Sequence, residues 1–120
     1  MSHRVFLNRD GFIEQVYTGD QTGDSIDQAI KKSTNIIKQM QKDGKSVLIL
    51  VDSTKLGKLS TPTRKSSVEA LRNIHYEKVA IYGPNPIAKA MINLIIHASG
   101  KHSSVRFFNE RPAAEKWLRN

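Results

Sequence analysis

The chain has 120 residues, 38% hydrophobic and 25% charged, a balance that predicts one globular domain and excludes a fibrous or disordered chain. It has no cysteine, which excludes disulfides, thiolate metal sites and thiol nucleophiles and fits a reducing compartment, so we expect a cytoplasmic protein. The net charge of +8 favours an anionic partner, such as a nucleic acid, a phospholipid headgroup, a phosphorylated protein or a nucleotide.

The positive charge is concentrated in the second half of the sequence. Residues 61–120 contain ten Lys/Arg against four Asp/Glu, whereas residues 1–60 contain nine against seven. The basic residues are scattered along the chain, so a solvated basic surface explains them as well as an anionic partner does. No recognisable nucleic-acid-reading element accompanies the charge, and we do not expect nucleic acid to be the partner.

The N-terminal residues predict a β-hairpin. Arg4–Asn8 alternates apolar and polar residues, and Phe12–Thr18 alternates again after Asp10-Gly11, a dipeptide favoured in tight turns. The start of the chain lacks a basic stretch followed by a long apolar one, so we expect no signal peptide.

The next segment predicts a helix of about Asp24–Lys42. It follows a polar connection over residues 19–23, and Thr22, Asp24 and Ser25 are each suited to cap its first turn. Its apolar residues recur mostly at helical spacing and form one stripe: Ile26, Ala29, Ile30, Ile36 or Ile37, and Met40.

The chain is organised around an apolar run, Val47–Val51, whose length and β-branched residues are typical of a central strand covered on both faces. Asp52 ends this strand, and a polar loop over residues 53–60 leads to a second helix at about residues 62–74. Thr61 suits the N-cap, and the proline after it suits the first helical position, where a missing N–H costs nothing.

Two further strands and two further helices follow. Lys78–Tyr82 is a second apolar run, and Asn85 then marks the start of a third helix, Pro86–Ser99, with the same cap-and-proline device. Val105–Phe108 predicts a last strand, and Pro112–Arg119 a last helix.

The third helix is apolar over an unusually wide part of its surface. It is short and interrupted by Lys89, Asn93 and His97, so we expect no transmembrane segment. The simplest interpretation is a helix wedged between the sheet and its neighbours. The alternatives are that it lines a pocket for an apolar ligand or contacts a partner chain, which leaves homo-oligomerisation open.

The resulting order is ββαβαβαβα. Strands that alternate with helices after an opening hairpin imply an α/β fold with a single mixed sheet. We therefore predict a mostly parallel, five-stranded sheet packed by helices, in one domain that spans residues 1–120.

Five segments carry a resemblance to a known family: Val47–Asp52, Thr61–Lys65, Lys78–Gly83, Val105–Phe108 and Ala114–Leu118. In order and spacing they resemble the SpoIIAA-like family, a relative of the STAS domains that is sometimes grouped with the CRAL-TRIO lipid-carrier fold. The resemblance covers nearly the whole chain and implies a STAS-like domain. It also implies a non-enzymatic regulatory or binding module whose partner is another protein.

The resemblance further implies a candidate modification site. In the anti-sigma-factor antagonists, a serine at the helix start after the central strand is phosphorylated by a partner kinase, and the corresponding place here is Ser60 and Thr61. The alternative function is a carrier of a small apolar or lipid-like ligand, as is suspected for some members of the family. We expect four residues to line such a site: Tyr82, Ile87, Met91 and Ile95.

Topology gives the candidate recognition site. Ligands of open parallel sheets tend to bind beyond the carboxyl ends of the strands, and two helix N-termini with free N–H groups follow these ends. If the two strands are neighbours, one concavity would bind a partner or an anionic group through nine residues: Asp52, Ser53, Thr54, Lys58, Ser60, Thr61, Arg64, Gly83 and Asn85. The alternative is that the caps only start their helices and the basic residues only aid solubility.

The sequence holds no catalytic, metal or cofactor signature. The four histidines lack metal-ligand spacing, and there is neither a Gly-x-Ser-x-Gly elbow nor a phosphate-binding Walker loop. We therefore expect no enzyme activity, no metal and no cofactor.

Overall fold

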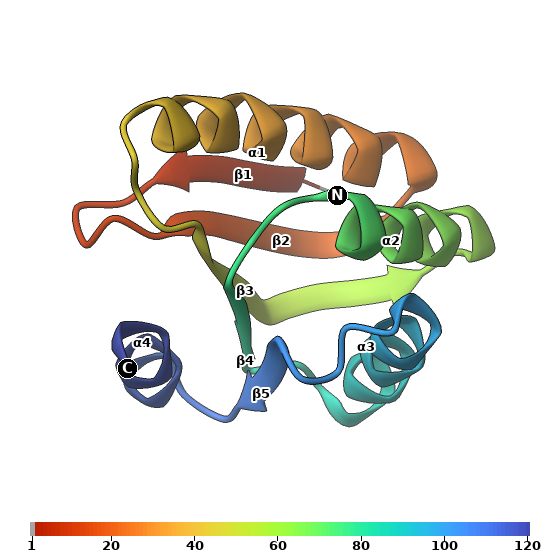
Figure 1. The fold of residues 1–120 in the computed structure, drawn as a ribbon. Coiled ribbons are helices and arrows are strands. Elements are labelled where there is room, and N and C mark those ends of the chain that lie inside the picture. The colour runs from red at the N-terminus through yellow and green to blue at the C-terminus, as the bar shows by residue number, and fades with distance from the viewer. Residues whose placement is uncertain (1) are drawn as a thin grey trace.

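A computed structural model describes residues 2–120 (Figure 1). These residues form five strands and four helices in the order ββαβαβαβα, which confirms the predicted fold class. The elements are β1 (Ser2–Leu7), β2 (Ile13–Gln21), α1 (Gly23–Lys42), β3 (Leu48–Leu59), α2 (Thr61–Asn73), β4 (Lys78–Tyr82), α3 (Pro86–Ser99), β5 (Val105–Phe108) and α4 (Arg111–Arg119).

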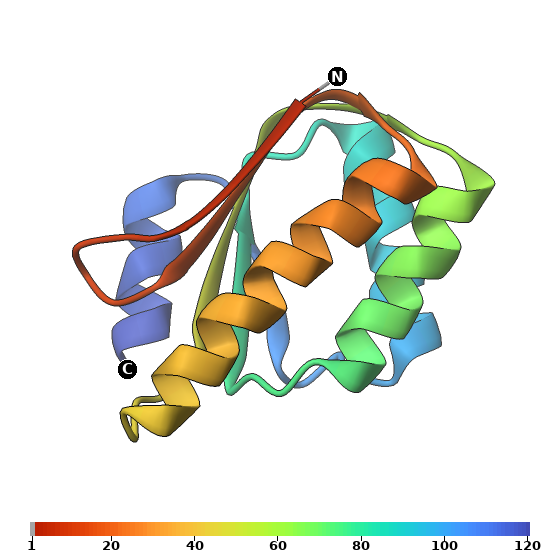
Figure 2. The same ribbon diagram turned by 90° about the horizontal axis from the view of Figure 1, so that it is seen from above.

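The strands lie in the sheet in their sequence order, β1-β2-β3-β4-β5. The hairpin of β1 and β2 is antiparallel, and the three following pairs are parallel. Each of α1, α2 and α3 therefore connects one strand to its parallel neighbour, and crossovers that advance in one direction place their helices on one face of the sheet. Figure 2 shows these three helices on one side and α4 on the other.

Both faces of the sheet are buried. Along β3, Ile49 packs in the core beneath the three-helix layer, whereas Leu50, which is fully buried, packs in the smaller core beneath α4. Trp117 of α4 extends this second core, and its ring lies 5.7 Å from that of Phe108. The expectation of a central strand covered on both faces is confirmed.

The end of β3 was predicted wrongly. The strand continues from Asp52 to Leu59, through residues expected to form a loop, because it pairs in parallel with β2 as far as Gln21 opposite Leu59. Residues 19–21, expected in a connection, belong to β2 for the same reason. The pairing of β3 with β4 ends at Asp52 opposite Tyr82, so the extension is a sheet edge and accepts polar residues.

The helix caps follow the sequence closely. Thr22 caps α1 and forms a capping box with Ser25. Ser60 caps α2, one residue before the predicted Thr61, because its hydroxyl accepts from the Thr63 N–H and the proline occupies the second helical position. Asn85 caps α3 as predicted.

Helix α3 packs on the sheet with one face and leaves the other in solvent. Ile87 and Leu94 are 77% and 60% exposed, so packing between the sheet and neighbouring helices accounts for only part of the apolar surface of α3. Helix α3 therefore has more apolar residues than its one buried face uses. No helix in the part of the chain that the structure describes is long and apolar enough to cross a membrane.

We predict that Asn85→Ala lowers the free energy of unfolding by about 1–2 kcal/mol. The Asn85 side chain accepts from the Ala88 N–H at 2.8 Å and donates to the Leu56 carbonyl at 3.3 Å, so it both caps α3 and ties it to β3. Asn85→Ser retains a capping oxygen, so its free energy of unfolding should fall by less than that of Asn85→Ala. Urea unfolding measures both values, and equal stability of the alanine variant and the wild type would contradict the prediction.

Candidate functional site

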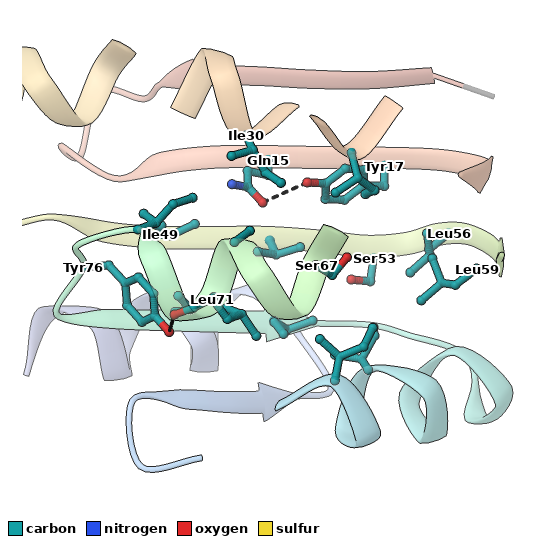
Figure 3. A pocket seen from close by; sticks show the side chains of 18 residues that line it. Gln15, Tyr17, Ile30, Ile49, Ser53, Leu56, Leu59, Ser67, Leu71 and Tyr76 are labelled. Atoms are coloured by element: carbon teal, nitrogen blue, oxygen red, sulfur yellow. Dashed lines mark hydrogen bonds between the residues drawn. The ribbon is translucent and has the colours of Figure 1, made fainter. Parts of the chain in front are cut away.

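An apolar cavity of about 130 Å³ lies between the sheet and the three-helix layer (Figure 3). We call it the helix–sheet cavity. Its floor includes Val51 of β3 and Ile81 of β4, and its walls include Ile30 of α1, Leu71 of α2 and Ile95 of α3. The cavity is therefore built from every layer on this face of the sheet.

Strand alternation explains which residues reach the cavity. Side chains two residues apart point to one face of a sheet, so Gln15 and Tyr17 of β2 lie on the cavity side, as do Val51 and Ser53 of β3. Among the described residues that line the cavity, none carries an ionisable acid or base other than the phenols of two tyrosines. The space is thus apolar, with a few neutral polar groups.

Most of these polar groups already have partners. The Tyr17 hydroxyl donates to Gln15 Oε1 at 3.0 Å, and Gln15 Nε2 donates to Ser33 Oγ at 2.9 Å. The Tyr76 hydroxyl donates to the Leu71 carbonyl at 3.2 Å. Burial raises the pKa of Tyr17 well above its usual value and that of Tyr76 to about 12, so both phenols are neutral near pH 7.

Ser53 differs from these groups. Its side chain is 1% exposed, and its hydroxyl forms no hydrogen bond with any of residues 2–120. Ser67 lies on the opposite wall, where its hydroxyl donates to the Thr63 carbonyl at 2.8 Å and keeps its lone pairs. Figure 3 shows both serines among the side chains that line the cavity.

A second hollow, a groove between α1 and α2, lies over the helix–sheet cavity. The groove measures about 370 Å³ and is lined by polar as well as apolar residues of the two helices. It shares Ile30, Ala70 and Ile74 with the cavity, so these three side chains separate the cavity from the groove. The cavity and the groove therefore adjoin at these three side chains.

The structure places the four residues predicted to bind an apolar ligand in different surroundings. Ile95 lines the cavity, but Ile87 is exposed, because eight helical residues turn the side-chain direction by about 80°. Met91 lies between these directions, and its sulfur accepts from Arg64 Nη1 at 3.7 Å. Tyr82 faces α4 on the other side of the sheet. The predicted set does not form one pocket.

The nine residues predicted to form one concavity also lie in separate places. Asp52 accepts from the Thr54 N–H at 3.0 Å and from its hydroxyl at 2.6 Å. A side chain at Gly83, whose φ is +73°, would collide with Thr54, so these three residues are neighbours. Ser53 points into the cavity instead, because strand alternation turns it to the opposite face.

The remaining predicted residues lie farther along the chain. The Lys58 N–H donates to Asp20 Oδ1 at 2.7 Å near the end of β2, and Ser60, Thr61 and Arg64 belong to the start of α2. The extension of β3 causes this separation, since each strand residue advances the chain by roughly 3.3 Å. Asn85 contacts β3 through the Leu56 carbonyl.

Sequence reasoning missed a polar cluster beneath α4. Glu14, which is 6% exposed, accepts from Arg111 Nη2 at 2.7 Å and Nη1 at 3.0 Å and from Asn8 Nδ2 at 3.1 Å. Arg111 Nη1 also lies 3.4 Å from the Tyr82 hydroxyl. The one available signal in the sequence was a carboxylate directly after two apolar residues, Phe12 and Ile13, at the start of β2.

The cluster favours ionised carboxylates. Burial opposes ionisation of Glu14, but the hydrogen bonds from Arg111 and Asn8 outweigh it, and the pKa of Glu14 lies below its usual value. Burial likewise opposes ionisation of Asp52, and hydrogen bonds from Thr54 outweigh it, so its pKa is lowered as well. Burial raises the pKa of Tyr82 to about 12. The cluster fastens α4 to the sheet.

Comparison with solved structures identifies the class of fold. A crystal structure from Shewanella loihica PV-4, an uncharacterized protein from the DUF3478 family with a SpoIIAA-like fold, matches with a TM-score of 0.61 and 20% identity over 98% of this chain and 92% of that one. The fold is therefore SpoIIAA-like, which confirms the resemblance seen in the sequence. The model of a domain of unknown function, DUF7793, matches residues 13–120, and the chain belongs to this family. None of the curated proteins is significantly similar in sequence.

We predict that Glu14→Gln lowers the free energy of unfolding at pH 7 by about 1–3 kcal/mol. Solvent screens the Arg111 side of the ion pair, which is partly exposed, and this keeps the expected loss below that of a fully buried pair. Because the folded-state pKa of Glu14 is lowered, its contribution is present above the unfolded pKa and is lost as the pH falls through the folded value. The difference between variant and wild type in urea unfolding should shrink over that range.

Asp10→Asn is the matched control, because the Asp10–Arg119 pair, at 3.5 Å, is exposed on both sides. It should change the free energy of unfolding by less than about 0.5 kcal/mol. A Glu14 effect that stays constant at acidic pH would show that packing, rather than charge, holds α4.

Proposed function

We propose that the protein is a non-enzymatic binding module that holds a small apolar ligand in the helix–sheet cavity. The observation that carries the proposal is the cavity itself, a partly open apolar space beneath three helices. Ligand sites are typically concave and mainly apolar, with a small number of placed polar groups. The SpoIIAA-like fold supplies the scaffold, and the function rests on the cavity.

The size of the cavity limits the ligand. Its volume is about 130 Å³, and an engineered apolar cavity of about 150 Å³ in another protein binds benzene. A ligand with about six to eight non-hydrogen atoms therefore fits without rearrangement. A longer chain would have to extend between Ile30 and Ala70 into the groove above.

We expect toluene, a probe of the right size, to bind the purified protein and to raise its melting temperature. Ala70→Leu adds three carbon atoms at the border of cavity and groove and should weaken toluene binding at least tenfold while the protein stays folded. Isothermal titration measures the affinity, and NMR chemical shifts locate the ligand.

Ala90→Leu provides the control, since Ala90 is exposed on α3 and away from the cavity. Its toluene affinity should equal that of the wild type. Toluene binding that Ala70→Leu leaves intact, or chemical-shift changes away from the cavity, would contradict the proposal.

A second candidate function is a phosphorylation-controlled module that recognises another protein at the start of α2. Thr61 is exposed in the first helical position, and Arg64 Nη2 lies 3.2 Å from its hydroxyl. A phosphate there would meet the positive end of the helix dipole and a guanidinium. Ser60 is also exposed, and its hydroxyl is hydrogen-bonded within the first turn to the Thr63 hydroxyl at 2.7 Å.

If the module is controlled by phosphorylation, protein purified from its own host should carry a covalent phosphate. Intact-mass measurement followed by peptide mapping should place it on Ser60 or Thr61. In vitro, Thr61→Glu should raise the free energy of unfolding by about 0.3–1 kcal/mol relative to Thr61→Gln, because a negative charge favours the helix N-terminus. An unmodified protein, together with equal stability of the two variants, would contradict the switch.

A further inference from the structure

We propose that the ligand of the helix–sheet cavity is a neutral molecule with one hydrogen-bonding group, such as a phenol, a small alcohol or a ketone, and that this group pairs with Ser53. The inference rests on the proposed cavity function and names its ligand class. It starts from the fact that Ser53 is almost fully buried and that its hydroxyl has no partner among residues 2–120.

Other hydroxyl groups that are buried or half-buried on this face are paired. Ser33 and Ser67, on helices, donate to the carbonyl one turn back, at 2.9 and 2.8 Å, and Thr63 donates to the Gln21 carbonyl at 2.8 Å. A strand, unlike a helix, offers no carbonyl one turn back for its own serine hydroxyl. Buried polar groups are nearly always paired, so the exception at Ser53 points to a partner from outside the chain.

The position of Ser53 aims that partner into the cavity. Its neighbours on β3, Asp52 and Thr54, lie on the opposite face and bond to each other, whereas Ser53 shares the cavity face with Val51. Ser67 faces it from α2, with its donor used and its lone pairs free. One ligand hydroxyl can therefore accept from Ser53 and donate to Ser67, and a carbonyl can accept from Ser53.

The surroundings exclude a charged group at this point. In the described part of the chain, the cavity lining has no Lys, Arg, His, Asp or Glu, and a buried carboxylate or ammonium without a partner is strongly unfavourable. The hydrogen-bonded chain from Tyr17 through Gln15 to Ser33 is complete in itself. A neutral polar group of the ligand next to Ser53 therefore suits this part of the cavity.

The test compares three probes of similar size on the wild type and on Ser53→Ala. Toluene has no polar group, phenol has one neutral hydroxyl, and benzoate is charged. On the wild type, phenol and toluene should bind and benzoate should not. Ser53→Ala should weaken phenol binding about five- to tenfold and leave toluene affinity within twofold, since one neutral hydrogen bond is lost.

A structural readout accompanies the binding data. Ser53→Ala removes an unpaired buried hydroxyl, so its melting temperature without ligand should equal or exceed that of the wild type. Ser99→Ala is the buried-serine control: the Ser99 hydroxyl donates to the Ile96 carbonyl at 2.6 Å, so that variant should be less stable but should bind phenol normally.

The outcomes separate this inference from the proposed function. Toluene binding with no loss of phenol affinity in Ser53→Ala overturns the role of Ser53 and leaves the apolar cavity function standing. Failure of every probe to bind overturns both. Benzoate binding in the cavity overturns the neutral ligand class.

Discussion

The parallel pairing of β2 with β3 continues from Ile13 opposite Ile49 to Gln21 opposite Leu59, well past the point where β4 stops pairing with β3. The chain that leaves β3 therefore begins α2 beyond the end of β4 and must run back across the sheet to reach the start of β4. Helix α2 packs against both α1 and α3 on this return path, and Figure 1 shows it between them. The roof of the cavity depends on this extended pairing.

The two faces of the sheet are stabilised by different physics. Three crossover helices cover one face with mostly aliphatic contacts, and their packing leaves the cavity. One short helix covers the other, where a small apolar core is supplemented by the half-buried Glu14–Arg111 pair. The ion pair adds a directional contact to the packing of α4, whereas hydrophobic burial, which is non-directional, holds the three-helix layer.

Much of the fold could be predicted because its signals are local. The run Val47–Val51 predicts a strand, and the Asn85-Pro86 pair predicts the start of a helix, each from a few neighbouring residues. The extension of β3 could not be predicted in this way, because residues 53–58 are mostly polar and become a strand through pairing with a distant segment.

The site was harder to predict than the fold. The separation of Asp52 from Ser53 follows from alternation once the strand is known to continue past Val51. Glu14 and Arg111 are 97 positions apart, so their contact has no local signal. The cavity is a volume that side chains from six elements and the α2–β4 connection leave unfilled, and no single residue or short motif encodes it.

The face of the sheet beneath α4 has an optical signal of its own. The sequence has one tryptophan, and its ring packs against Phe108 beneath α4, on the face away from the cavity. Tyr17 and Tyr76 line the cavity itself. Tryptophan fluorescence therefore reports whether α4 is docked, and loosening of this helix can be followed without an added label. The tyrosine signal combines both faces, because Tyr82 lies beneath α4.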